Sequence, residues 1–238
     1  MDILFTLVAS VVLIIGFLVV CRVADEEEDE EEPTMAPTTP EPATQKAFKR
    51  LERQASSCRI CPALADQPAV LSSANGNLNA KIVFVAEAPG RFGAGRTGVP
   101  FHGDKSGDNF ETLLKYIGLT RSDVFITNAA LCNPLANGNN RRPKISEVKN
   151  CSPFLKTILD LIRPEIVVTL GSVGLQALNL LLGTKYQLKN KVAQRLSTPN
   201  FILLPLYHPS PRVTNWMRPL AQQKKDFKKI PWSNSTSK

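Results

Sequence analysis

The sequence is poor in histidine, and its folded part is poor in acidic residues. Only two of its 238 residues are histidines, and His208 is one of them. Residues 1–43 hold ten of the 21 acidic residues and one of the 29 basic ones, which leaves 11 acids and 28 bases for residues 44–238, a net charge of +17. A charge of this size on a compact domain favours a polyanionic partner, first of all nucleic acid. A merely solubilising surface is the alternative.

The N-terminus lacks the features of a cleaved signal peptide. Residues 3–20 carry no charge, and this length is close to the minimum that spans a bilayer. Asp2 stands where a signal peptide needs a basic residue, and the segment from Cys21 to Ala24 is a poor cleavage site. We therefore predict an uncleaved anchor over residues 1–24, with the folded part at the cytoplasmic face of a membrane. The alternative is a wrongly assigned start codon and a cytoplasmic protein.

The next segment lacks apolar residues that could be buried. Residues 25–32 are an unbroken acidic run, and residues 33–44 are rich in proline, threonine and alanine. Such composition predicts a disordered linker over residues 25–44. We expect one domain over residues 45–232 and a disordered tail over residues 233–238.

Within that domain, strand patterns alternate with helix patterns. Continuous apolar runs predict strands over residues 81–86, 124–128, 166–171 and 201–206. Helical patterns cover residues 46–57, 110–117, 145–162 (with a break near Pro153) and 173–182. This alternation predicts an α/β fold of three layers, α/β/α, around a mostly parallel four-stranded sheet.

Polar motifs follow directly after the predicted strands. They are residues 87–90, Asn128, residues 171–172 and residues 208–210. Because the carboxyl ends of parallel strands share one edge, where ligands bind in such sheets, we expect these motifs to converge on one site.

Four of the five cysteines have the pattern of a metal site. Cys58 and Cys61 form a C-x-x-C pair, and Cys132 and Cys151 follow later, whereas Cys21 lies alone in the apolar segment. The pair precedes the first strand, which argues against a thioredoxin-like redox motif. Four thiolates suit zinc and an iron–sulfur cluster equally well, and buried structural thiols are the third possibility.

Two further features have a structural and a functional interpretation. The glycine-rich segment 87–101 has neither a Walker pattern nor a suitably placed G-x-G-x-x-G, but its glycines can let backbone N–H groups approach a ligand or phosphate. Phe101 can be a core residue or a stacking platform for a base. A lone histidine is more often structural, yet the place of His208 after a strand makes a site role equally plausible.

These motifs together resemble the uracil-DNA glycosylase superfamily, specifically its iron–sulfur families 4 and 5. The resemblance runs from about residue 56 to residue 211 and rests on the segments 86–90, 98–107, 126–132, 151–155 and 208–210, with their order, spacing and cysteines in agreement. It implies a monomeric, monofunctional enzyme that hydrolyses the glycosidic bond of uracil in single- or double-stranded DNA. Base flipping is required, because this bond is unreachable inside the stack.

The resemblance also assigns the site residues. It implies that Cys58, Cys61, Cys132 and Cys151 hold a structural [4Fe–4S] cluster. Phe101 stacks on the flipped uracil, Asn128 bonds its Watson–Crick edge, and His208 donates to its O2 oxygen as charge develops. Glu87, Ala88, Pro89 and Gly90 line the pocket, and Glu87 orients water or stabilises the sugar cation. Ser106 and Ser210 contact phosphates.

Some positions depart from the family patterns. Family 1 has an aspartate where Ala88 stands. Segment 91–108 looks like family 5, whereas Glu87 looks like family 4. The identity of the group that activates water and the tolerance of other deaminated bases therefore stay open. Residues 141–144 lack the histidine of the branch that bonds covalently to DNA, so no covalent chemistry is expected. Trp216 and Met217 can form a wedge into the duplex or pack in the core. Two other functions stay open: the protein can be a membrane-tethered DNA-binding protein without catalysis, or a zinc-bound structural domain.

Overall fold

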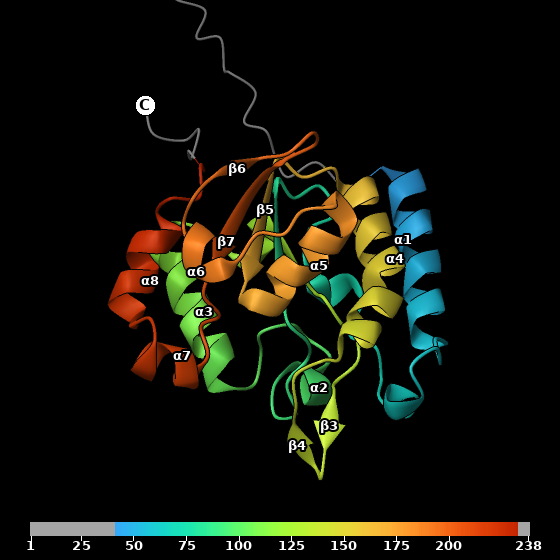
Figure 1. Ribbon diagram of the computed structural model, residues 1–238. Coiled ribbons are helices and arrows are strands. Elements are labelled where there is room, and N and C mark those ends of the chain that lie inside the picture. Colours follow the sequence, from blue (N-terminus) through green and yellow to red (C-terminus); the bar gives the residue numbers. More distant parts are fainter. Residues whose placement is uncertain (1–40, 233–238) are drawn as a thin grey trace, which may run out of the picture. The chain divides into compact units, whose positions relative to one another are not determined.

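The computed structural model describes residues 41–232, which form a three-layer α/β/α domain (Figure 1). The central sheet has five strands in the order β2-β1-β5-β7-β6. Four of them are parallel, namely β1 (Ile82–Ala86), β2 (Val124–Asn128), β5 (Ile166–Leu170) and β7 (Ile202–Leu206). The fifth, β6 (Leu196–Ser197), pairs antiparallel with β7. The α/β class and the four parallel strands are confirmed, and β6 corrects the predicted strand number from four to five.

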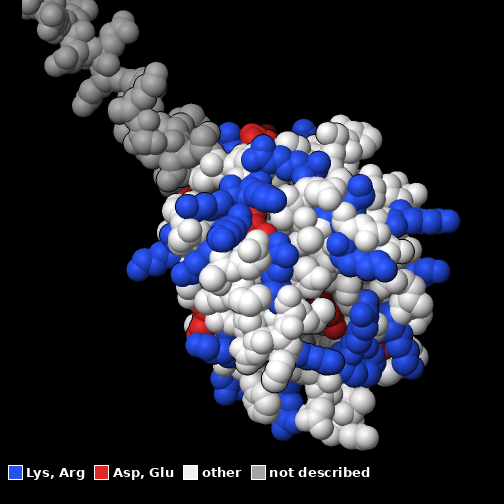
Figure 2. All heavy atoms as spheres, turned by 60° about the vertical axis from the view of Figure 1, so that its left-hand side comes forward, with Lys and Arg blue, Asp and Glu red and all other residues white. Residues whose placement is uncertain are grey.

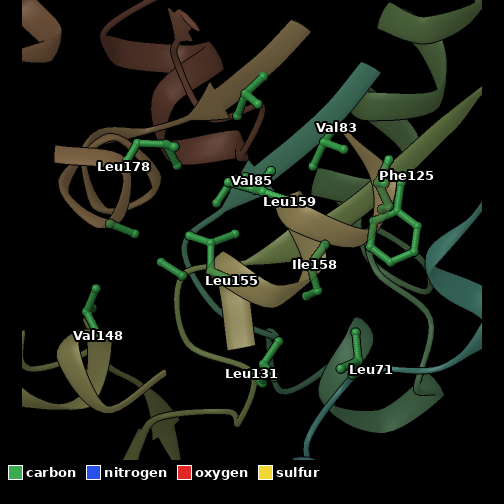
Figure 3. Close-up of a cluster of buried hydrophobic side chains, with 14 of the residues drawn as sticks. Leu71, Val83, Val85, Phe125, Leu131, Val148, Leu155, Ile158, Leu159 and Leu178 are labelled. Carbon is green, nitrogen blue, oxygen red and sulfur yellow. The ribbon is translucent and has the colours of Figure 1, made fainter. Parts of the chain in front are cut away.

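One face of the sheet is covered by α1 (Pro42–Ser56), α4 (Ile145–Ile162) and α5 (Ser172–Leu182). The side chains between these helices and the strands form one continuous core cluster, part of which Figure 3 shows. Val83 and Val85 of β1 point into it, and Leu155, Ile158 and Leu178 meet them from the helices. Gly174 lets α5 approach closely, because a Cβ atom there would lie 2.3 Å from the backbone oxygen of Val85.

The opposite face carries α3 (Lys105–Tyr116) and α8 (Leu220–Phe227). Ile82, Phe84 and Ala86 alternate with the residues on the first face and join a second core cluster, as expected for a strand buried on both sides. Phe84 meets Phe110 of α3 edge-on at 5.2 Å and stacks with Phe227 of α8 at 6.0 Å between ring centroids.

The remaining elements are short. Three 3₁₀ turns span Pro62–Leu64 (η1), Ser73–Asn75 (η2) and Arg121–Asp123 (η3). The short helices are α2 (Ala94–Thr97), α6 (Leu188–Lys191) and α7 (Pro211–Trp216). A small hairpin of β3 (Leu135–Ala136) and β4 (Asn139–Asn140) projects from the carboxyl edge of the sheet, at the bottom of Figure 1.

The predicted break in α4 is wrong, since the helix runs unbroken through Pro153. Proline has no N–H to donate to the carbonyl four residues earlier, which is that of Lys149. The hydroxyl of Ser152 donates to this oxygen instead, at 2.8 Å. The hydroxyl thus replaces the missing backbone bond, and the helix continues.

The prediction of a membrane anchor falls on residues 3–20, outside the described part of the chain. Among residues 41–232, no helix is both long enough and apolar enough to cross a membrane. The prediction of disorder is wrong for residues 42–44, which belong to α1, so the folded domain begins at residue 42 or earlier. The predicted linker before residue 41 and the predicted tail lie outside the described residues.

Candidate functional site

The four polar motifs lie together at the carboxyl edge of the sheet, as predicted. Asn128 of β2 is the register partner of Ala86 of β1. The residues that follow these two strands, Glu87 and Ala129, therefore lie side by side. The N–H of Gly171 donates to the oxygen of Leu206 at 2.8 Å, and a Cβ atom on Gly171 would lie 3.3 Å from the Cβ of His208. Glycine at position 171 therefore leaves room for the imidazole.

Phe101 lies over the second core cluster and faces this edge. Its ring is stacked on Phe110 with 4.5 Å between centroids and 19° between planes. It is tilted by 35° against the imidazole of His208, at 5.3 Å. The backbone φ of Phe101 is +49°, in the left-handed region that bulky residues rarely adopt. The structure thus holds an aromatic ring beside His208 at some conformational cost.

Asn128 ends β2 and is only 5% exposed. Its Nδ2 amide group has no hydrogen-bond partner among the described residues. Leaving a buried donor unpaired is costly, so native structures rarely do it without a ligand or a functional reason. Five buried side-chain atoms lack a partner among the described residues, and the Asn128 amide is the one that lies in the last residue of a strand of the central sheet, where ligands bind in such sheets.

His208 is half-buried and follows β7. Burial lowers the pKa of its imidazole from 6.5 to about 4, against the opposing effect of the Asp104 carboxylate. The ring is therefore neutral at neutral pH and carries one N–H donor. The segment is held in place by Asn109, whose Nδ2 donates to the oxygen of Pro209 at 2.8 Å.

Glu87 follows β1 and is half-buried. Burial raises the pKa of its carboxyl above 4.5, and the positive charge of Arg142 partly offsets that rise. A carboxyl tuned in this way, next to a ligand site, is suited to proton transfer or to orienting water.

Asp104 is a second acid at the site, and the sequence analysis missed its role. Its Oδ1 accepts from the N–H of Gly107 at 3.0 Å and caps α3. Its Oδ2 lies against the glycine-rich segment, since a Cβ atom on Gly93 would be 2.5 Å away and one on Gly90 3.3 Å away. The sign that could have revealed it is an aspartate followed by polar residues directly before a helix, which is a usual N-cap pattern.

Part of the glycine-rich segment is closed on itself by backbone hydrogen bonds. The N–H groups of Gly93 and Gly95 both donate to the oxygen of Gly90, at 3.1 and 2.9 Å. The glycines instead permit close packing of side chains, because a Cβ atom on Gly95 would lie 2.9 Å from the amide of Asn133. The N–H groups of Gly93 and Gly95 are therefore not available to a ligand or phosphate.

The predicted phosphate contacts lie at the same edge. Ser106 is in the first turn of α3, Ser210 precedes α7, and both are half-buried. At the end of α7, Trp216 is 85% exposed, and the next residue, Met217, is 61% exposed. The alternative of core packing is thus wrong for both. The face of the domain around α3 and α8 shows many lysines and arginines and few acids (Figure 2).

The four cysteines come from different elements but lie in one region. Cys58 follows α1, Cys61 precedes η1, Cys132 follows β2, and Cys151 is inside α4. None of the four is in a disulfide. The bridge between Ala69 and Cys132 brings the segment after η1 against the end of β2.

The thiols influence one another electrostatically. Burial, and then the other three cysteines, raise the pKa of Cys132 to about 11, with Arg59 opposing. Burial is also the main cause that raises the pKa of Cys151 to about 11. Asn150 donates to the sulfur of Cys61 at 3.3 Å. Within residues 41–232, however, no three His, Cys, Asp or Glu side chains are close enough to enclose a single metal ion.

Comparison with known proteins agrees with this geometry. The profile of the Uracil DNA glycosylase superfamily matches residues 74–234. The chain belongs to the uracil-DNA glycosylase superfamily. The match covers every strand of the central sheet and all the proposed pocket residues.

Several curated members of this superfamily are similar to the chain. A type-4 uracil-DNA glycosylase of Archaeoglobus fulgidus is 35% identical over 185 residues, which are 75% of this chain and 88% of the relative. One of Sulfurisphaera tokodaii is 30% identical over 190 residues, covering 77% and 83%. A type-5 uracil-DNA glycosylase of Pyrobaculum aerophilum is 35% identical over 153 residues, covering 59% and 66%. The similar proteins thus include members of both types.

Proposed function

We propose that this protein is a monofunctional DNA glycosylase that hydrolyses the N-glycosidic bond of uracil in DNA and leaves an abasic site. The observation that carries the proposal is the buried, unpaired amide of Asn128 at the sheet edge that also holds Phe101 and His208. The relatives named uracil-DNA glycosylase support the same reaction.

In this proposal the flipped base is recognised by one ring and one amide. Phe101, backed by Phe110, stacks on the base. The Asn128 amide donates to the uracil O4 oxygen, where cytosine presents a donor of its own. The unpaired Nδ2 then gains the acceptor that the protein does not supply.

His208 acts on the leaving group. As the glycosidic bond breaks, negative charge accumulates on the uracil O2 oxygen, and the N–H of a neutral imidazole donates to it. The low pKa keeps the imidazole neutral before reaction. Its N–H group therefore stabilises the negative charge that develops on the uracil O2 oxygen in the transition state.

Two carboxyl groups are candidates for orienting the attacking water. Glu87 is the half-buried acid that follows β1, and Asp104 is the acid that caps α3 and acts electrostatically on His208. The backbone of Ala88, Pro89 and Gly90 lines the pocket beside Glu87. Ala88 offers no third carboxylate.

The DNA backbone is proposed to lie across the carboxyl edge. Ser106 and Ser210 contact phosphates on either side of the flipped nucleotide, and the surrounding lysines and arginines supply salt-dependent affinity. The exposed side chains of Trp216 and Met217 fill the gap that the flipped base leaves in the stack.

The four cysteines fit a [4Fe–4S] cluster better than a single zinc ion. A cluster binds one thiolate at each iron and so spreads its ligands more widely than one ion does. The electrostatic effect of the other three cysteines on Cys132 supports a shared site for the four thiols. Cys58, Cys61, Cys132 and Cys151 would hold the cluster, which would join the start of the domain to β2 and α4. Its contribution is structural, and no step of the reaction requires it.

Two parts of the proposal concern the setting of the enzyme. The apolar residues 3–20 are proposed to associate with a membrane, and the protein is proposed to act as a monomer on the cytoplasmic side. A glycosylation-site insertion before residue 3 and gel filtration of the detergent-solubilised chain would test the two statements.

The activity is tested by incubating the full chain with a uracil-containing oligonucleotide and then treating the product with alkali. Strand cleavage at the uracil position is expected. Asn128→Ala and His208→Ala should each reduce the rate by about 100- to 1000-fold. Salt-dependent DNA binding without base release, from protein that retains its cluster, would instead support a DNA-binding protein that has lost catalysis.

A further inference from the structure

The backbone of Phe101 must be held in place, because it is strained. Its φ of +49° is unusual for an aromatic residue. Such a conformation persists only where the surrounding structure fixes it. The ring of Phe101 continues directly from this backbone, so the groups that hold the peptide also set the position of the ring.

Side chains bind three successive carbonyl groups in this loop. The oxygen of Gly103 accepts from Arg96 at 3.3 Å, and that of His102 accepts from Thr97 at 3.2 Å. Both donors belong to α2, which is part of the same loop. The oxygen of Phe101 accepts from Nη2 of Arg121 at 2.7 Å, and this donor comes from η3, beyond α3. Arg121 thus ties the loop to the body of the domain.

The place of Arg121 suits this task. Its side chain is 28% exposed, its Nε pairs with the carboxylate of Glu111 on α3, and its Nη1 is buried without a hydrogen-bond partner among the described residues. A charged donor that is partly withdrawn from water makes a stronger bond than a neutral one. On the other side of the Phe101 carbonyl is Gly107, where a Cβ atom would lie only 2.4 Å from the oxygen. The carbonyl therefore fits between a glycine of α3 and the guanidinium.

We propose that Arg121 is a positioning residue for base recognition, which keeps the Phe101 ring at the angle that a flipped base needs. This inference rests on the proposed function of Phe101. Arg121 itself does not touch the base, because its Nη2 and Nε bind Phe101 and Glu111 and its Nη1 is buried. Its effect reaches the reaction only through the backbone of Phe101.

The first test compares Arg121→Ala and Arg121→Lys with wild type in single-turnover uracil excision. Misplacement of a binding group by about an ångström can cost about 100-fold in rate, so Arg121→Ala should lose about 10- to 100-fold. Affinity for uncleaved DNA should change less than about threefold, since the phosphate contacts remain. Arg121→Lys keeps one charged donor and should recover most of the rate. Glu111→Gln, the matched control, keeps the bond to Phe101 and should lose less than about threefold.

The second test places Arg121→Ala in a Phe101→Ala background. A residue that acts only through the Phe101 ring has nothing left to position there, so the further loss should be less than about twofold. An equal loss in both backgrounds, or no loss in Arg121→Ala alone, would overturn the proposal.

A third measurement does not depend on catalysis. Hydrogen exchange of the free protein should quicken in residues 97–104 in Arg121→Ala but not in Glu111→Gln, because only the first variant releases the loop. Unchanged exchange there would refute the positioning role even if the protein excised no uracil. If exchange quickens in Arg121→Ala although the wild-type protein excises no uracil, the positioning role is retained and the proposed reaction is rejected.

Discussion

The low pKa of His208 predicts that acid destabilises the native protein through this one residue. Burial lowers the pKa from 6.5 to about 4. Below pH 6.5 the imidazole of His208 binds a proton in the unfolded chain but not in the native protein. The contribution of this residue to the free energy of unfolding is therefore complete above pH 6.5 and is lost as the pH falls towards 4. The half-buried ring opens to the pocket, so the full shift corresponds to at most about 3 kcal/mol. Of this, about 2 kcal/mol is lost between about pH 7.5 and about pH 5.

Two measurements check this prediction. The first is urea unfolding of wild type and His208→Asn at these two pH values, where the advantage of the wild type should shrink by up to about 2 kcal/mol on acidification. The second is an NMR titration, which is simple because the chain has two histidines. His102→Gln removes the exposed one and so assigns the resonance of His208. A resonance of His208 that titrates near pH 6.5 would show that the ring is not desolvated, and the argument for a neutral donor would fail.

Three further predictions concern the site and the scaffold. The raised pKa of Glu87 predicts a fall of kcat/KM on the acid side of its pH profile, at a pH above 4.5, and Glu87→Gln should abolish this acid limb. Arg142→Ala should move the limb to higher pH, because the charge of Arg142 lowers the Glu87 pKa. A limb that stays in place in Arg142→Ala would contradict this. Glu147→Ala should destabilise the protein by up to about 3 kcal/mol in urea unfolding, since it removes a buried carboxylate and leaves its half-buried partner Arg141 unpaired, and a loss below about 1 kcal/mol would show that this ion pair is solvated. Gly174→Ala should lower the melting temperature by several degrees, because the added Cβ meets a backbone oxygen of β1 at 2.3 Å, whereas an unchanged melting temperature would mean that α5 moves away freely.

The sequence was sufficient for the parts of the fold that depend on long apolar runs. The bounds of β2 and α4 agree with the predicted ones, and the site could be placed because the carboxyl ends of parallel strands meet at one edge. Asn128 and His208 follow from that rule alone. Their spatial relation needed no knowledge of side-chain packing.

Shorter elements gave too little pattern. The two-residue strand β6 has no period to detect, and α3 begins five residues before the predicted helix because its first turn contains a glycine and polar side chains. The roles of Asp104 and Arg121 depend on contacts between residues far apart in sequence. Arg121 reaches a backbone oxygen 20 residues away, and no periodicity or composition predicts such a contact.

The outer edge of β2 has a consequence for how molecules of this protein meet one another. A free strand edge offers unpaired N–H and C=O groups on which a second chain can build a sheet. Here the segment after η2 lies along that edge: the N–H of Asn77 donates to the oxygen of Val124 at 3.0 Å, and the Asn75 amide donates to that of Ile126 at 2.7 Å. Gly76 makes this possible, because any Cβ atom there would lie 2.2 Å from the Val124 oxygen. A single substitution at Gly76 should therefore expose the edge of β2, and precipitation at high protein concentration would be the expected sign.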